Sequence, residues 1–127
     1  MRVRTSLACL ILAACGSSSP STPPDAPTVD AAPPTVHTVT CPPGDMPTVM
    51  TSDNADAYDP MTTMISAHGI VKFVMSNTHD VGPNPIMPSD SGLHVGFGQT
   101  ACLEFDKAGT FSFLCTAHGF VGTIIVQ

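Results

Sequence analysis

The sequence is poor in basic residues and has no apolar run long enough to span a bilayer. Four lysine and arginine residues stand against ten aspartate and glutamate residues. Nucleic acids are bound mainly through clustered lysine and arginine side chains, so this composition argues against a nucleic-acid partner. The apolar stretch at residues 7–14 is shorter than the roughly 20 residues that a transmembrane helix requires. We therefore expect no nucleic-acid partner and no membrane-spanning helix.

The same apolar stretch has the length of a signal-peptide core. It follows Arg2 and Arg4 and ends in Leu-Ala-Ala-Cys at Cys15, which resembles the lipobox of bacterial lipoproteins. The resemblance implies a signal peptide at residues 1–14, a lipid on Cys15 and, because Gly16 follows, sorting to the outer membrane. We expect the lipid anchor to be the only membrane contact, at the periplasmic face of the bacterial outer membrane. The alternative is an ordinary cleaved signal with an unrelated cysteine.

Residues 15–35 have the composition of a linker. Six prolines fall within residues 16–35, and no aromatic residue occurs there. Proline prevents a regular helix, and so few apolar side chains cannot offset the entropy cost of ordering. We expect a disordered tether that precedes a domain at residues 36–127. Without the signal peptide, two basic and ten acidic residues remain, a formal charge of −8 that would steer a cationic partner.

No helical periodicity of useful length occurs in residues 36–127. Short runs of alternating apolar residues occur instead, separated by turn signals rich in glycine, aspartate and asparagine. This pattern predicts an all-β domain, a small sandwich or barrel. The runs that we interpret as strands are residues 63–66, 71–75, 102–105, 110–114 and 123–126.

Three cysteines follow residue 15, an odd number for an oxidising compartment: Cys41, Cys102 and Cys115. One of them should therefore have a role other than pairing. Cys115 lies three residues before His118, near the end of a predicted strand, and we assign that role to it. Cys41 and Cys102 are then expected to form a disulfide, which would stabilise the fold by about 3–5 kcal/mol on the entropic model.

Cys115 and His118 are separated by two residues, so both can face one centre if the loop between strands curls around it. A thiolate with two imidazoles makes the trigonal site that copper prefers in electron-transfer proteins. Taken alone, this C-x-x-H spacing is a weak signal. It is not a haem-attachment motif, because Ala117 stands where that motif needs a second cysteine.

Four segments together resemble the cupredoxins, the family of plastocyanins, amicyanins and pseudoazurins. Residues 58–73 are similar to the family's F-x-P-x-x-I-x-V-x-x-G-D-x-V-x-F pattern, and residues 77–81 to its H-N-V segment. Residues 105–115 resemble the F-x-x-x-G-x-Y-x-Y-x-C run, and residues 122–126 resemble the closing G-x-I-x-V strand. The resemblance covers roughly residues 58–127. It implies a Greek-key β-sandwich of about seven to eight strands.

The resemblance implies that His79, Cys115 and His118 hold one copper ion as its equatorial ligands. Asp80 stands where the family usually has asparagine, at a position that ties the first ligand loop to the residue after the cysteine, here Thr116. The Asp80 carboxylate is expected to accept a hydrogen bond from the Thr116 hydroxyl or from a backbone N–H. The alternative is an exposed aspartate in a turn.

The chain departs from the family at the axial position. The family usually has a methionine a few residues after the second histidine, but residues 119–122 contain none. Aligned on the final glycine, Phe120 takes that position; counted from His118, Val121 does. Neither side chain coordinates a metal, so the reduction potential is expected to be raised. The alternative is that another methionine covers the copper: Met46, Met50, Met75 or Met87.

These features predict a type 1 blue copper protein that carries single electrons between redox partners, such as a c-type cytochrome or a copper oxidase. His118 is expected to present its ring edge to solvent within an apolar collar suited to brief docking. The collar would comprise Gly119, Phe120 and either Pro83 or Pro85. No general acid, general base or substrate pocket is evident in the sequence, so we do not expect an enzyme.

Several alternatives stay open. The same ligands could serve a copper chaperone or resistance factor that holds Cu(I) without redox cycling. An interaction domain that has lost its metal is disfavoured by the intact ligand set. A cysteine hydrolase is remote, because Cys115 lies on a strand and not at a helix N-terminus, and zinc could enter by mis-metallation. The other histidines are expected at the surface: His37, His68 and His94, the last in a short strand.

Overall fold

The computed structural model describes residues 32–127; the expected signal peptide, Cys15 and most of the linker lie outside the described residues. The described part contains nine strands and no helix, so no helix in it could cross a membrane. The strands are β1 (Val36–Val39), β2 (Thr48–Ser52), β3 (Ala55–Asp59), β4 (Thr62–Ile65), β5 (Gly69–Val74), β6 (Gly82–Pro83), β7 (Thr100–Phe105), β8 (Gly109–Leu114) and β9 (Val121–Val126).

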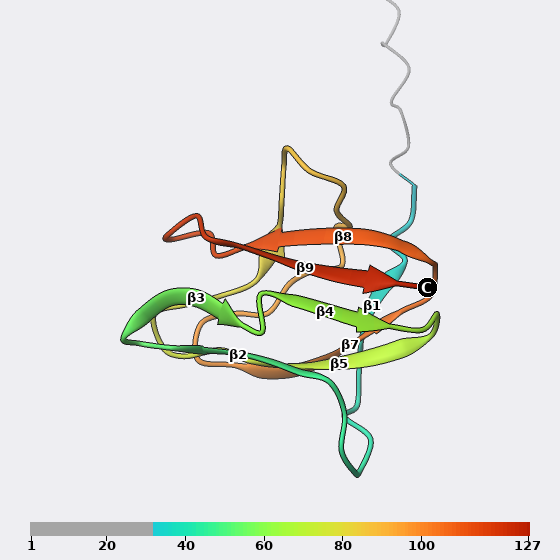
Figure 1. Cartoon of the computed structure of the whole chain (residues 1–127), viewed down its shortest axis with the longest axis horizontal. Helices are drawn as coiled ribbons and strands as arrows, with labels where there is room; N and C mark the ends of the chain where they lie inside the picture. Colours follow the sequence, from blue (N-terminus) through green and yellow to red (C-terminus); the bar gives the residue numbers. More distant parts are fainter. Residues whose placement is uncertain (1–31) are drawn as a thin grey trace, which may run out of the picture. The chain divides into compact units, whose positions relative to one another are not determined.

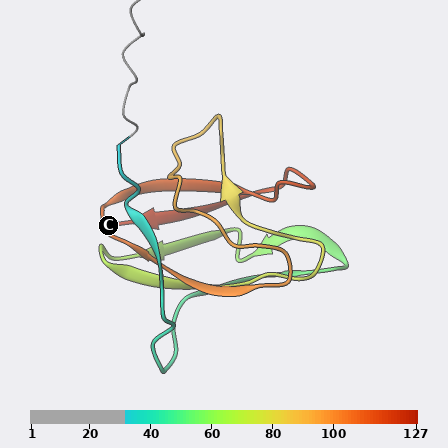
Figure 2. The same cartoon turned by 180° about the vertical axis from the view of Figure 1, so that it is seen from behind.

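The strands form two sheets that face each other as the layers of a sandwich (Figure 1). One sheet has the order β1-β7-β5-β2-β3, and the other has the order β4-β9-β8-β6. β2 pairs with β5 and β4 pairs with β9 in parallel, whereas the other pairs are antiparallel. The view from behind in Figure 2 shows β1 at one edge of its sheet. The predicted all-β sandwich is confirmed, with nine strands in place of seven or eight.

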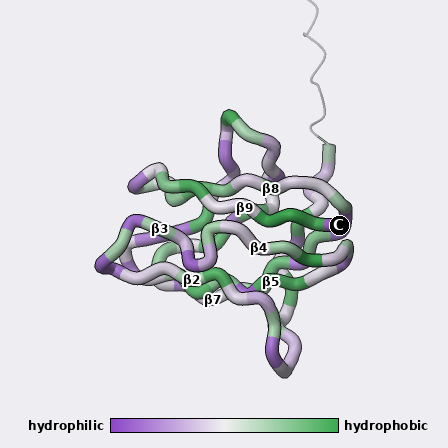
Figure 3. Tube along the Cα trace, viewed as in Figure 1, coloured by the Kyte–Doolittle hydropathy of each residue, from purple (hydrophilic) through white to green (hydrophobic). Residues whose placement is uncertain are grey.

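Alternation of side chains along the strands places the core between the two sheets. In β5, Val71 and Phe73 are fully buried, while Lys72 between them is partly exposed. In β9, Ile124 and Val126 are buried in the same alternating manner. Figure 3, coloured by hydropathy, shows hydrophobic residues along β9 and hydrophilic residues at the turn between β2 and β3. The core therefore follows directly from the period-two pattern of the sequence.

A disulfide joins Cys41, which follows β1, to Cys102 in β7. The two cysteines are 61 positions apart in the sequence. Cys102 is the partner of Val39 in the β1–β7 ladder, and Cys41 lies two residues after Val39. The structure thus contains the disulfide expected from cysteine parity, and Cys115 is the free cysteine of the described residues.

The five predicted strands correspond to β4, β5, β7, β8 and β9, with ends that differ by at most two residues. The segment around His94 is not the short strand that we expected. It contains one isolated bridge, between Val95 and Val81. The reason is a turn just before it, in which the N–H groups of Leu93 and His94 donate to the carbonyls of Asp90 and Gly92. His94 itself is exposed, as expected.

Candidate metal centre

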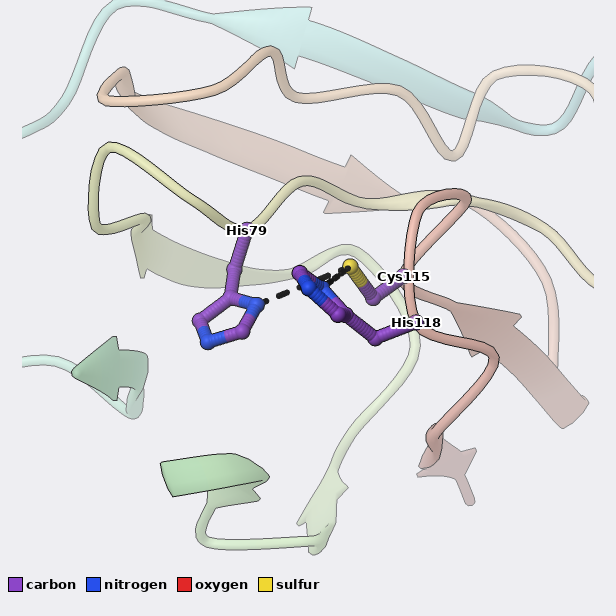
Figure 4. Close-up of side chains that lie close together, drawn as sticks. All are labelled: His79, Cys115 and His118. Carbon is purple, nitrogen blue, oxygen red and sulfur yellow. Dashed lines mark hydrogen bonds between the residues drawn. The ribbon is translucent and has the colours of Figure 1, made fainter. Parts of the chain in front are cut away.

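Two loops bring His79, Cys115 and His118 together at one end of the sandwich (Figure 4). His79 lies in the connection between β5 and β6, Cys115 directly follows β8, and His118 lies in the turn that leads to β9. The Cys115 Sγ atom is 3.7 Å from His79 Nδ1 and 3.5 Å from His118 Nδ1. The structure therefore places all three expected ligands around one point.

Two backbone hydrogen bonds shape the loop that carries Cys115 and His118. The N–H of Cys115 donates to the carbonyl of Phe120 at 3.0 Å, and the N–H of Gly119 donates to the carbonyl of Cys115 at 2.8 Å. Gly119 has a φ of 76°, a left-handed conformation that glycine adopts without a Cβ clash. The loop therefore turns back on itself within a few residues and directs His118 toward the sulfur.

The two sulfur–nitrogen separations are those of a trigonal metal site. An ion about 2.3 Å from a thiolate and about 2.0 Å from an imidazole, with the two bonds at 120°, separates the donors by about 3.7 Å. The two measured sulfur–nitrogen separations, 3.7 and 3.5 Å, agree with this value. One thiolate and two imidazoles are the donor set typical of copper in electron-transfer sites. The residues present therefore fit one copper ion.

The burial of the three residues is unequal. Cys115 and His79 are buried, with exposed fractions of 0% and 1%, whereas His118 is exposed. The thiol and the first imidazole are thus shielded from water, and the second imidazole connects the site to the surface. This is the exposure of His118 that we expected from its place in the loop.

Asp80 and Thr116 connect the two ligand loops. Thr116 donates its N–H to Asp80 Oδ1 at 2.7 Å and its hydroxyl to Asp80 Oδ2 at 2.6 Å. Asp80 is buried, so the carboxylate is held by the protein and is not an exposed turn residue. The residue beside His79 is therefore fixed to the residue beside Cys115, as the sequence predicted.

Phe120, and not Val121, faces the ligand rings. The Phe120 ring lies 4.9 Å from the His79 ring, edge-on, and 6.4 Å from the His118 ring, nearly parallel to it. Val121 begins β9 and is 40% exposed. Of the two residues that the sequence offered for the axial position, Phe120 is the one whose apolar ring lies beside the ligands.

The four methionines considered as axial ligands have other surroundings. Met46 Sδ lies 3.7 Å from Cys102 Sγ of the disulfide, and Met75 Sδ accepts a 4.0 Å hydrogen bond from the Thr51 hydroxyl. Met50 and Met87 are 46% and 55% exposed.

Tyr58 supports the site in a way that the sequence did not indicate. Its hydroxyl donates to the backbone carbonyl of Asp80 at 2.6 Å, and its ring packs edge-on against Phe120 at 4.7 Å. Burial, with negative charge at Cys115 and Asp80, raises the pKa of the Tyr58 phenol above its ordinary value. The phenol therefore stays protonated and keeps donating. The sequence pattern showed only that an aromatic residue is present at position 58.

A second feature that the sequence did not indicate concerns the far side of the His79 ring. Its Nε2 atom is buried and has no hydrogen-bond partner among the described residues. The Asp56 Oδ1 atom is 3.8 Å from it, and the Asp56 side chain is 68% exposed. The His79 ring is therefore positioned mainly by packing and by its loop, with a carboxylate nearby.

Comparisons with known proteins identify the fold. No protein-family model matches the sequence, and no curated protein matches it significantly. Among solved structures, amicyanin from Paracoccus versutus is 20% identical and has a TM-score of 0.57; the match covers 74% of this chain and 99% of amicyanin. Pseudoazurin from Hyphomicrobium denitrificans is 20% identical with a TM-score of 0.52, over 65% and 76% of the two chains. A mutant amicyanin in the reduced Cu(I) form is 16% identical with a TM-score of 0.56, over 73% and 99%.

The described residues therefore have the cupredoxin-like fold that the sequence motifs predicted. In this fold, His79, Cys115 and His118 form a group that fits one copper ion.

Proposed function

We propose that this chain is a type 1 copper protein that carries single electrons between redox partners. One observation carries the proposal: the buried Cys115 Sγ lies 3.7 Å from His79 Nδ1 and 3.5 Å from His118 Nδ1, separations that suit a trigonal site. Support comes from the similarity in fold to amicyanin, one mutant of which is known in a reduced Cu(I) form.

The chain's own residues perform three tasks in this function. Copper, when bound, would supply a one-electron couple between Cu(I) and Cu(II). The donor atoms are held in place by the Asp80–Thr116 hydrogen bonds and by the backbone hydrogen bonds within the loop after Cys115. Little rearrangement of the ligands therefore accompanies electron transfer. The buried Cys115 and His79 exclude water, and the exposed His118 provides the route to a partner at the surface.

The partner that we propose is a redox protein, such as a c-type cytochrome or a copper oxidase, met in the bacterial cell envelope. Supporting features are the signal-like residues 1–14, the cysteine of the lipobox and the acidic composition, which favours a partner with a cationic surface. A Cys15→Ser variant expressed in a bacterium should leave the membrane fraction, while a Cys9→Ser variant should stay in it. Equal fractionation of both variants would contradict the lipid anchor.

A second candidate is a copper-handling protein that holds Cu(I) without redox cycling. The Phe120 ring favours it, because an apolar group beside the ligand rings offers no donor that would help to stabilise Cu(II). In this case the same three ligands would store or deliver the metal.

Repeated redox cycling of the copper-loaded chain separates the two functions. An electron carrier keeps one copper per chain through successive cycles of reduction and oxidation, with a reversible voltammetric wave. A Cu(I)-handling protein loses the metal on oxidation. His118→Ala should abolish the wave, whereas His94→Ala, at an exposed histidine of the same domain, should keep it. Loss of copper in the first oxidation would reject the carrier.

A further inference from the structure

A second group of potential metal ligands lies at the opposite end of the sandwich. His68 lies in the turn between β4 and β5, whereas Cys115 and His118 lie in the loop between β8 and β9, and Figure 1 shows these connections at opposite ends. One donor atom each from His68, Glu104 and Asp106 lies within 4.8 Å of the other two. None of these residues has a part in the copper site.

The register of β7 explains why two carboxylates share this face. Phe105 is fully buried in the core, so Glu104 before it and Asp106 after it both point to the opposite, outer side. The N–H of His68 donates to the carbonyl of Phe105 at 2.8 Å. This bond attaches the turn to Phe105, the residue between the two carboxylates. The His68 ring therefore lies beside both of them.

The separations from His68 to the two carboxylates are close to those of a tetrahedral site. His68 Nδ1 is 3.9 Å from Glu104 Oε1 and 3.7 Å from Asp106 Oδ1. A zinc ion with ligands at about 2.0–2.2 Å holds tetrahedral donors about 3.4 Å apart. For the two pairs that include His68, the required approach is a few tenths of an ångström, and the two carboxylates lie within 4.8 Å of each other. Partly exposed side chains can make it by rotation, and the three side chains here are 71%, 32% and 36% exposed.

His37 holds one of the carboxylates in position. It is the cross-strand partner of Glu104 in the β1–β7 ladder, and its Nε2 donates to Asp106 Oδ2 at 2.9 Å. The two oxygens of Asp106 thus have different surroundings: Oδ2 accepts from His37, and Oδ1 faces His68. Ligand carboxylates in metal sites are commonly oriented by such a hydrogen bond.

We propose that His68, Glu104 and Asp106 bind one divalent transition-metal ion of the zinc type, with His37 as a positioning residue. One imidazole and two carboxylates suit zinc, whereas calcium and magnesium take oxygen ligands in larger number. Two carboxylates one residue apart also favour a cation between them, because it removes their mutual repulsion. With three protein ligands and an exposed histidine, a fourth coordination position is left for water.

Zinc titration of the full chain tests the proposal independently of copper. The parent for this experiment carries Cys9→Ser, Cys15→Ser and Cys115→Ser, which removes every cysteine outside the Cys41–Cys102 disulfide and takes the thiolate ligand from the first site. Isothermal titration with Zn²⁺ should show one bound ion per chain. His68→Asn is the central variant, because asparagine tolerates the φ of 59° that His68 adopts and keeps the turn intact.

His68→Asn and Glu104→Gln should each weaken zinc binding more than about tenfold, and His37→Ala about tenfold. The matched control His94→Asn should bind as the parent does. The His68 ring signals in NMR spectra should shift when zinc is added, and those of His94 should not. Equal affinity in His68→Asn and His94→Asn, loss in His68→Asn without loss in Glu104→Gln, or no zinc binding at all would overturn the proposal.

Discussion

Thr116 donates two hydrogen bonds to the Asp80 carboxylate, one from its N–H at 2.7 Å and one from its hydroxyl at 2.6 Å. Each residue directly adjoins a proposed ligand in the sequence, Asp80 after His79 and Thr116 after Cys115. The pair therefore fixes the distance between two loops that come from different parts of the chain.

Replacing Asp80 tests this connection. Asp80→Ala removes the acceptor for both bonds, so we expect the free energy of unfolding to fall by about 1–3 kcal/mol. Asp80→Asn keeps one carbonyl oxygen as an acceptor and should lose less. Urea unfolding monitored by circular dichroism measures both variants. An equal loss in the two variants would contradict the assigned role of the acceptor.

The reduction potential should respond to the residue at position 120. Phe120→Met places a thioether against the ligand rings, where it can coordinate weakly and stabilise Cu(II). We expect the potential of the copper-loaded protein to decrease. Val121→Met introduces the same side chain at an exposed position and should leave the potential near that of the parent. Voltammetry measures the reduction potentials of the parent and the two variants. An equal decrease of the potential in both variants would contradict the placement of Phe120 at the axial position.

Asp90 should contribute to the acid sensitivity of the fold. Its partial burial acts to raise the pKa, but hydrogen bonds from the N–H groups of Thr35 and Gly92 and from the Thr35 hydroxyl outweigh this effect and lower the pKa below 3.8. Because the folded-state pKa is depressed, the stabilisation is present above the unfolded-state value and is lost as the pH falls through the folded-state value.

Asp90→Asn removes this titration. The unfolding free energy of the variant should therefore change less steeply than that of the parent as the pH decreases below about 4. Asp45→Asn alters an exposed aspartate and is the matched control. Urea unfolding at a series of pH values gives the comparison. Identical slopes for the Asp90 variant and the parent would contradict the assignment.

The disulfide between Cys41 and Cys102 should stabilise the fold without affecting the copper site. Loss of a native disulfide in a small domain commonly costs about 2–5 kcal/mol. We expect a loss of this size in the Cys41→Ala/Cys102→Ala double variant. The visible spectrum of its copper-loaded form should match the parent, because Cys102 lies in the sheet that does not carry Cys115. A double variant with a changed visible spectrum and the stability of the parent would contradict both expectations.

The proposed ligands could be predicted from the sequence because their signals are local. Cys115 and His118 are separated by two residues, and the alternating strand before them is a strong period-two pattern. His79 could be placed only through the resemblance in the surrounding motif. Among the strands that were not predicted, β1 and β3 have weak patterns: β3 buries only Tyr58, and β1 fully buries only Val36. Such edge strands are specified by their neighbours in the sheet and not by their own alternation.

Other features depend on contacts between distant segments and could not be predicted. The choice between Phe120 and Val121 depends on where β9 begins, which a count of residues cannot decide. The group of His68, Glu104 and Asp106 requires the turn after β4 to bond to β7, and the sequence alone indicated only exposed histidines.

The copper site is tested most directly by the visible absorption spectrum of the full chain after loading with Cu(II) and removal of excess metal. We expect an intense blue band from the bond between the Cys115 thiolate and copper, which disappears on reduction and returns on reoxidation. The band should be absent from Cys115→Ser and retained in Cys15→Ser, which differ only in which cysteine is replaced. A colourless parent, or a band that survives in Cys115→Ser, would contradict the assignment of the copper site.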